Sequence, residues 1–269
     1  QPLPDLLPSL ERAGIRTQID QPNGRLAIMR LNHLQAPFND PRMRRAVLMS
    51  VNQEDYMRST VGDDRSLWNP CRSLYACGTP YARDFGAEAM RGDRAAAKRM
   101  LAEAGYANQP VVIINPTDFP AIGPLGQVSA EALKAIGLNV DLRESDWGTV
   151  IQRRNSREPV DKGGWSIFHT FGSAPAYATP AVSTLLRSQG ASAWYGWPND
   201  PAIETMVQEW LAAPDPAAQA KVADAIGIAA LANVNTIPLG QFFVKTAFRR
   251  QIAGVMQGVA PYPWNVRPA

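Results

Sequence analysis

The sequence lacks several features that mark large classes of protein. It contains no run of 18 or more apolar residues, so no helix is predicted to span a bilayer. Its 27 basic and 24 acidic residues are interspersed and the net charge is only +3, which argues against a nucleic-acid partner. The first residues lack the basic start and apolar run of a signal peptide, although a processed chain would look the same.

The motifs that carry most enzyme chemistry are also missing. There is no G-x-S-x-G elbow, no H-E-x-x-H zinc motif, no P-loop and no G-x-G-x-x-G segment that leads into a helix. The two histidines, His33 and His169, lie far apart and belong to no metal-binding motif. We therefore predict a protein with no catalytic residue, no metal and no cofactor, that is, not an enzyme.

Cysteine is scarce as well, with Cys71 and Cys77 in the segment NPCRSLYACG. Their spacing does not fit a C-x-x-C redox motif, and no second Cys or His pair completes a zinc site. Two interpretations remain, either two unrelated thiols or a disulfide that pins a short loop in an oxidising compartment. We predict the disulfide because both cysteines lie in one turn-rich loop.

The sequence does contain a clear helix pattern. Asp40, Asp93, Asp200 and Asp215 each precede a segment with helical apolar spacing, and three of them are followed directly by proline. Aspartate is a good N-cap, and proline is well tolerated at the first helical position. The pattern predicts a helix after each of these residues and a further helix over residues 129–136.

Short apolar or alternating segments between the helices predict strands. They cover residues 26–29, 111–114, 138–142, 164–169, 237–239 and 242–244. A chain of 269 residues, of which 45% are hydrophobic, can bury one large core or two small ones. The alternation of strands and helices predicts an α/β domain with a mixed sheet flanked by helices. Both chain ends lack a complete core and are expected to pack against something else.

Several segments, taken in order, resemble one family of transport proteins. They are residues 36–47 (APFNDPRMRRAV), 97–106 (AKRMLAEAGY), 133–140 (LKAIGLNV), 215–217 (DPA), 237–239 (IPL) and 264–267 (WNVR). Together they are similar to the peptide, nickel and oligosaccharide-binding proteins of ABC importers, the extracellular solute-binding protein family 5. The order of the segments carries the resemblance more than any one of them does.

The resemblance implies a fold and a division of the chain. Family members have two lobes joined by a hinge, and the sequence fits the C-terminal lobe, a fragment with a periplasmic-binding-protein-like fold. On that pattern, residues 1–35 hold the end of the first lobe and the hinge crossing. Residues 36–235 form the second, ligand-binding lobe, and residues 236–269 return toward the first lobe.

The resemblance also implies a function. A periplasmic monomer would capture a small solute (a peptide, opine, sugar or aromatic acid) between its two lobes and deliver it to an ABC permease in the membrane. No nucleic acid takes part. The sequence does not identify which solute is bound.

Aromatic and polar side chains near the predicted turns are the candidate ligand contacts, because loops after strands line ligand crevices in α/β domains. They are Trp165, His169, Phe171, Ser173, Tyr177, Trp194, Tyr195 and Trp197. Packing is the alternative role for each of them. It applies most to Trp165, within a predicted strand, and to His169, since a lone histidine at a strand end commonly has a structural role.

The loop expected after residues 164–169 departs from the family pattern. In peptide-binding relatives this loop carries an acid that holds the α-amino group of the ligand, whereas residues 170–180 contain no Asp or Glu. A buried ammonium group without an anion is costly. We therefore expect a neutral, acidic or aromatic solute.

Two other functions fit parts of the pattern. A small hydrolase-type enzyme could use the same α/β scaffold, and turnover of a substrate would identify it despite the absent nucleophile motif. A ligand-sensing module for a membrane receptor could use the same lobe, and the gene neighbourhood would separate it from a transport component.

Overall fold

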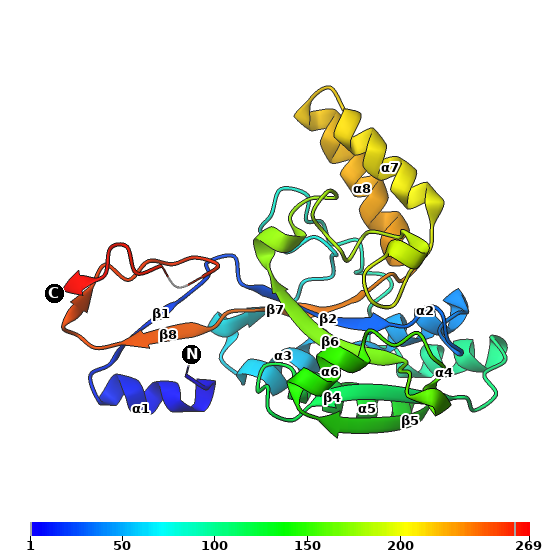
Figure 1. Ribbon diagram of the computed structural model, residues 1–269, viewed down its shortest axis with the longest axis horizontal. Coiled ribbons are helices and arrows are strands. Elements are labelled where there is room, and N and C mark those ends of the chain that lie inside the picture. Colours follow the sequence, from blue (N-terminus) through cyan, green and yellow to red (C-terminus); the bar gives the residue numbers. More distant parts are fainter. Residues whose placement is uncertain (1, 261) are drawn as a thin grey trace.

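The computed structural model describes residues 2–260 and 262–269, which form a body with an arm on one side (Figure 1). The body is built on a six-stranded sheet in the order β3-β7-β2-β6-β4-β5. Its strands are β2 (Arg25–Leu31), β3 (Trp68–Asn69), β4 (Pro110–Pro116), β5 (Asn139–Ser145), β6 (Ile167–Ser173) and β7 (Ile237–Phe242). β4 pairs in parallel with β5 and β6, whereas β2 pairs antiparallel with β6 and β7. The predicted mixed α/β sheet is thus confirmed.

Four helices lie on one side of the sheet: α2 (Pro41–Ser50), α3 (Gln53–Val61), α4 (Arg94–Glu103) and α5 (Gly123–Ala135). Their apolar faces join alternate residues of the central strands, such as Met29 and Ile113, in the largest core cluster. The Asp40 and Asp93 side chains accept hydrogen bonds from backbone amides of the first turn. These caps start α2 and α4 where the sequence predicted.

The other side of the sheet carries α6 (Trp147–Arg153), α7 (Pro201–Ala212) and α8 (Pro216–Ala232), with long loops between them. α7 and α8 form a hairpin that projects from the body (Figure 1). Leu26 and Ile28 of β2 pack with Ile203 and Ile226 of these helices in a second core cluster. Short 3-10 segments are η1 (Pro4–Leu6), η2 (Arg65–Leu67), η3 (Val160–Lys162), η4 (Ala174–Tyr177) and η5 (Gly190–Ser192).

The arm is formed by the two ends of the chain. It contains α1 (Leu7–Arg12), β1 (Arg16–Ile19), β8 (Lys245–Phe248), β9 (Ile252–Ala253) and β10 (Arg267–Pro268). β1 pairs with β8 and β9 pairs with β10, both antiparallel, and neither pair joins the large sheet. Within the described residues, no helix has the length and apolar character needed to cross a membrane.

Several elements differ from those predicted, among them the strand expected over residues 242–244, of which only Phe242 is strand, as the last residue of β7. The helix expected over residues 129–136 already begins at Gly123, and α3 was not predicted. The strand expected over residues 164–169 runs from Ile167 to Ser173, because β6 pairs along its whole length with β2. Residues 170–173, expected to belong to a loop, are therefore strand.

The predicted disulfide between Cys71 and Cys77 is present. Gln53 of α3 holds one end of its loop, since its side-chain amide accepts from the Cys71 amide and donates to the Cys71 carbonyl. Gln241 of β7 makes the same pair of bonds with Cys77 and also donates to the Asn23 carbonyl. The loop is thus fixed to the body by side chains as well as by the covalent bond.

Candidate functional site

Three strand ends and the crossing to the arm meet at one edge of the sheet. Because β4 is parallel to β5 and β6, the last residues of all three strands point to the same edge. Ser173 at the end of β6 pairs with Arg25, the first residue of β2, so the chain enters the body from the arm there. Ligands of α/β sheets bind in the crevice outside the carboxyl ends of the strands. This edge is the candidate site.

Three half-buried aromatic rings stand at this edge and form what we call the edge cluster: Phe119, Trp147 and Phe171. Phe119 follows β4, Trp147 begins α6 after β5, and Phe171 belongs to β6. The Phe119 ring lies 5.5 Å from Trp147 and 5.9 Å from Phe171, centroid to centroid. Such rings offer apolar area, and Trp147 adds an N–H donor, to a solute at the edge.

Two of the predicted contacts, Phe171 and Ser173, lie at this edge and are half-buried. Tyr177 belongs to the same region but is only 6% exposed and packs in the second core cluster beneath Gly172. Burial raises the pKa of Tyr177 to about 12. A packing role therefore fits Tyr177 better than the expected ligand contact.

Trp165 and Trp197 lie at the opposite end of the sheet from the edge cluster. Their rings are 5.9 Å apart and are 0% and 5% exposed, respectively. The Trp165 indole donates a hydrogen bond to the Arg154 carbonyl at 3.1 Å. Neither ring presents surface to a solute, because both fill the core between α6 and the sheet.

His169 lies two residues deeper in β6 than Phe171, beneath α5, and is fully buried. Its Nε2 atom is 2.7 Å from the Ser129 hydroxyl, which donates a hydrogen bond to the Tyr56 hydroxyl at 3.1 Å. Burial lowers the pKa of His169 to about 3, so the ring is neutral at physiological pH. His169 links α5 and α3 to the sheet and does not reach the edge.

Trp194 and Tyr195 lie on the α6 side of the sheet and are both half-buried. The Trp194 ring packs 5.6 Å from Phe168. The Arg154 guanidinium carbon stands 4.5 Å from the Tyr195 ring centroid and 5.8 Å from that of Trp147. Arg154 therefore connects this loop to the edge cluster.

A fully buried arginine, Arg30 of β2, fixes the position of the same loop. Its guanidinium donates to the carbonyls of Tyr195 at 2.6 Å and Trp194 at 3.3 Å. It also donates to the Asn235 carbonyl and the Thr236 hydroxyl. Burial lowers the pKa of Arg30 to about 9. Backbone carbonyls, rather than a carboxylate, satisfy this charge.

Sequence reasoning did not select Phe119, Trp147 or Arg154 as contacts. One signal was available, because Trp147, the first residue of α6, and Arg154, its C-cap, are seven residues apart and so lie on the same side of the helix. Nothing in the sequence placed Phe119 between Trp147 and Phe171, since that contact joins strand ends that are distant along the chain.

The described residues do not assemble a metal site or a hydrolase triad. No group of three or more His, Cys, Asp or Glu side chains that could hold a metal ion occurs in residues 2–260 and 262–269. The Ser129–His169 pair resembles part of a triad, but within the described chain the buried Nδ1 atom of His169 has no hydrogen-bond partner. Both residues are 0% exposed, so no substrate reaches the hydroxyl.

A family model and a curated relative both match this chain to solute-binding proteins. The family model "Bacterial extracellular solute-binding proteins, family 5 Middle" matches residues 1–193. The chain is 33% identical over 268 residues to the protein named "Probable peptide ABC transporter periplasmic-binding protein y4tO" of Sinorhizobium fredii. That match covers 98% of the chain and 50% of the relative, so the chain spans about half the length of this curated relative.

Solved structures agree on the fold. The ABC transporter-associated periplasmic binding protein DppA of Helicobacter pylori, in complex with the peptide STSA, matches with a TM-score of 0.83 and 18% identity over 100% of the chain. The substrate-binding protein CtaP of Listeria monocytogenes matches with a TM-score of 0.81 and 18% identity over 94% of the chain. The matches cover 52% and 51% of these two proteins.

Proposed function

The chain belongs to the bacterial extracellular solute-binding proteins of family 5, and on this premise we propose that it forms one lobe, and part of the other, of a two-lobed solute-binding protein. The whole protein would work in the periplasm and deliver a small solute to an ABC permease. The chain matches about half of each relative over nearly its full length, which supports the assignment of one lobe and part of another.

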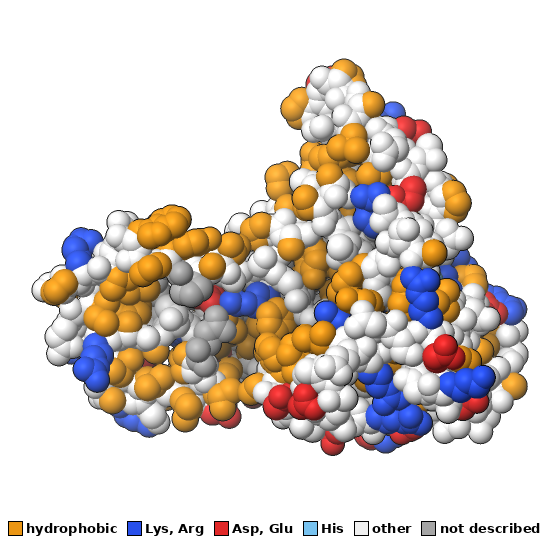
Figure 2. Space-filling model, in the orientation of Figure 1, with side chains coloured by type: hydrophobic (Ala, Val, Ile, Leu, Met, Phe, Trp, Pro, Cys, Tyr) orange, Lys and Arg blue, Asp and Glu red, His pale blue; other side chains and the backbone are white. Residues whose placement is uncertain are grey.

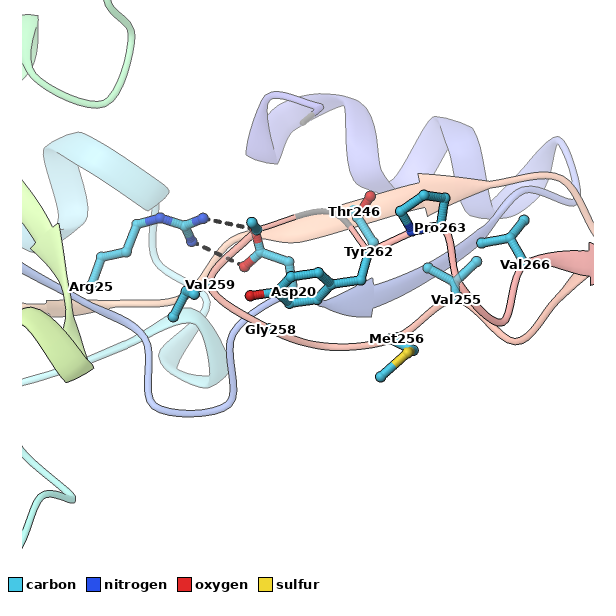
Figure 3. Close-up of a pocket in the computed structure, with 11 residues that line it drawn as sticks. Asp20, Arg25, Thr246, Val255, Met256, Gly258, Val259, Tyr262, Pro263 and Val266 are labelled. Atoms are coloured by element: carbon cyan, nitrogen blue, oxygen red, sulfur yellow. Dashed lines mark hydrogen bonds and ion pairs between the residues drawn. The ribbon is translucent and has the colours of Figure 1, made fainter.

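The body corresponds to the proposed ligand-binding lobe, and the arm to part of the other lobe. β2 and β7 are inner strands of the body sheet, although the sequence placed them in the crossing segments. We therefore propose narrower crossings, at residues 20–25 and 242–245. The bidentate ion pair between Arg25 and Asp20, at 2.7 and 3.0 Å, spans the first of them (Figure 3).

The surface of the arm supports this division. Hydrophobic side chains gather over it (Figure 2), and Leu6, Val259 and Trp264 are 51%, 51% and 77% exposed. A hollow of about 600 Å³ lies in the arm, with apolar side chains such as Val255 and Met256 on its walls (Figure 3). Exposed apolar area of this kind is typical of an interface, and the remainder of the first lobe is the occupant that we propose.

The solute would bind at the carboxyl edge of the sheet, where the arm joins the body. The observation that carries this proposal is the edge cluster, three rings brought from three strand ends to the border between the two parts. Of the predicted contacts, Phe171, Ser173, Trp194 and Tyr195 keep their proposed role. Trp165, His169, Tyr177 and Trp197 pack the core and are left out of it.

Closure of the two lobes would couple binding to transport. A solute that contacts both lobes stabilises the closed state by its additional contacts there. The permease would recognise that state. The crossings at residues 20–25 and 242–245 would absorb the change in backbone angles.

A thermal-shift screen of the full-length protein tests the proposal. The panel would contain peptides, opines, sugars, nickel chelates and aromatic acids. We expect at least one class to raise the melting temperature, because a ligand at 100 times its Kd stabilises the folded state by about 2.7 kcal/mol. We expect Phe119→Ala or Trp147→Ala to weaken that binding.

Leu211→Ala serves as the control, because Leu211 is a 56% exposed apolar side chain of α7, in the hairpin that projects from the body. The proposal fails if no class stabilises the protein, or if a panel compound is turned over. It also fails if the substitutions at the edge cluster leave the affinity at the wild-type value.

A further inference from the structure

Arg154 carries a positive charge that no group in the described chain neutralises. Its side chain forms no ion pair and no hydrogen bond with residues 2–260 or 262–269, and its Nε atom is buried without a partner. The residue follows α6 and is half-buried. A buried donor is normally paired, and the other N–H groups of this half-buried side chain are open to a bound molecule.

The surroundings of Arg154 orient its guanidinium without satisfying it. Its carbon lies 4.5 Å from the Tyr195 ring centroid and 5.8 Å from the Phe168 and Trp147 centroids. Contact with the ring faces attracts the cation but uses none of the N–H donors directed outward in the plane of the group. The rings thus hold the guanidinium while leaving its hydrogen-bonding fork available.

Glu158 and Asp161, the acids nearest to Arg154 in the chain, are exposed and form no ion pair with it in the described structure. The two acids beside Trp147 are occupied by the start of α6. Asp118 accepts a hydrogen bond from the Trp147 amide at 2.8 Å. Asp146 caps the helix by accepting from the Thr149 amide and hydroxyl. The segment that ends β6 and follows it, residues 170–180, contains no acid. Within the described residues, no carboxylate is therefore paired with the Arg154 guanidinium.

From these observations we propose that Arg154 anchors a carboxylate group of the bound solute. A guanidinium fork matches a planar carboxylate with two parallel hydrogen bonds. The apolar part of the same solute would lie toward the edge cluster, which shares Trp147 with the Arg154 environment. This inference rests on the proposed function, since it identifies the class of solute that the same site accepts.

The test compares acids with their amides on the full-length protein and on Arg154→Gln. Three probe pairs are used: the dipeptide Ala-Phe and its C-terminal amide, N-acetylphenylalanine and its amide, and phenylacetate and phenylacetamide. In at least one pair the acid is expected to bind the wild type at least about 10-fold more tightly than its amide. Arg154→Gln is expected to weaken binding of the acid by about 10- to 100-fold, the range for hydrogen bonds to charged groups. The affinity for the amide is expected to stay unchanged.

Arg157→Gln is the matched control. Arg157 also lies over a ring of the same loop, 4.9 Å from the Trp197 centroid, but it is exposed and donates to the Ala191 carbonyl. Its replacement is expected to leave both members of every pair at wild-type affinity. Calorimetric titration measures each Kd, and the melting temperature of the unliganded variants checks the fold.

Equal affinity for acid and amide in all three pairs overturns the inference, and so does an unchanged acid affinity in Arg154→Gln. If a compound of the broader screen binds but these pairs show no preference for the acid, the proposed solute binding stands and the carboxylate anchor is rejected. If neither set binds, both proposals are rejected together.

Discussion

Single buried polar side chains determine which loops of the body can face a solute. Arg30 donates hydrogen bonds to the carbonyls of Trp194 and Tyr195. Without these bonds, the carbonyl oxygens would lack a partner in the core, which costs free energy. Gly196, in the same loop, has φ +95°, and a Cβ there would meet the Leu31 carbonyl and the Arg30 side chain. Arg30 of the sheet and the close packing at Gly196 thus fix the position of Tyr195 beside Arg154.

The buried His169 predicts a loss of stability in acid. Its pKa in the folded state is about 3, against an ordinary value of 6.5, so the unfolded chain binds a proton at a higher pH than the folded protein does. The contribution of the neutral His169 ring to stability is fully present above pH 6.5 and is lost as the pH drops from 6.5 toward 3. By linkage, the loss from this residue reaches about 2 kcal/mol at pH 5. Urea unfolding at pH 7.5, 6 and 5 measures it.

His169→Gln is the variant for this prediction, since an amide can still bond to Ser129 but does not titrate. We expect its stability to depend less steeply on pH between 6.5 and 5. His33, whose pKa is also lowered, chiefly by burial, remains in both proteins. Parallel pH profiles for wild type and variant would show that His169 is not responsible.

The sequence showed which aromatic residues lie near turns, but not how exposed their rings are. Ring type and nearness to a turn are local properties, and they selected Phe171 and Tyr195 together with Trp165 and Trp197. Burial depends on what the rest of the chain lays over each ring, such as α6 over Trp165. A single sequence does not show those contacts.

At the scale of elements, local signals predicted the aspartate-capped helix starts but not the strand end that is set by distant pairing. The side chains of Asp200 and Asp215 accept from amides of the first turn of α7 and α8 as expected, because a cap depends only on its own turn. β6 extends to Ser173 because β2, more than 130 residues away in the chain, pairs with it. Such non-local pairing leaves little trace in the local pattern.

The disulfide loop gives a prediction at this scale. Removing the bond in Cys71→Ser/Cys77→Ser frees a loop with a sequence separation of only 6, which costs about 2 to 2.5 kcal/mol of stability in the chain-entropy model. Because Gln53 and Gln241 still hold both ends of the loop, the native structure and the solute affinity are expected to persist. Denaturant unfolding and a solute titration measure the two effects.

Wild-type protein treated with a dithiol reductant is the comparison for the double variant. Both should lose the same stability if the covalent bond alone is responsible. A variant that loses solute affinity as well would show that the two glutamines do not keep the loop in place.

At the scale of the whole molecule, body and arm differ in how complete they are. The body has a six-stranded sheet with helices on both sides and two large core clusters. The arm has two separate two-stranded pairs and one short helix, and its apolar side chains lie largely on the surface. The sequence had indicated this asymmetry, because neither end of the chain showed enough apolar periodicity to form a core.

If the other lobe covers the arm, a charge placed there should destabilise the full-length protein. Val259 on the arm and Ile228 on α8 are 51% and 56% exposed in this chain. From this chain alone, a charged side chain should therefore be tolerated equally well at the two positions. We expect Val259→Glu to cost at least about 2 kcal/mol in the full-length protein, because it buries an unpaired carboxylate. Ile228→Glu, which stays in water, should change stability by no more than about 0.5 kcal/mol. Denaturant unfolding compares the two variants, and equal tolerance would mean that the arm remains uncovered and that the proposed lobe boundary is misplaced.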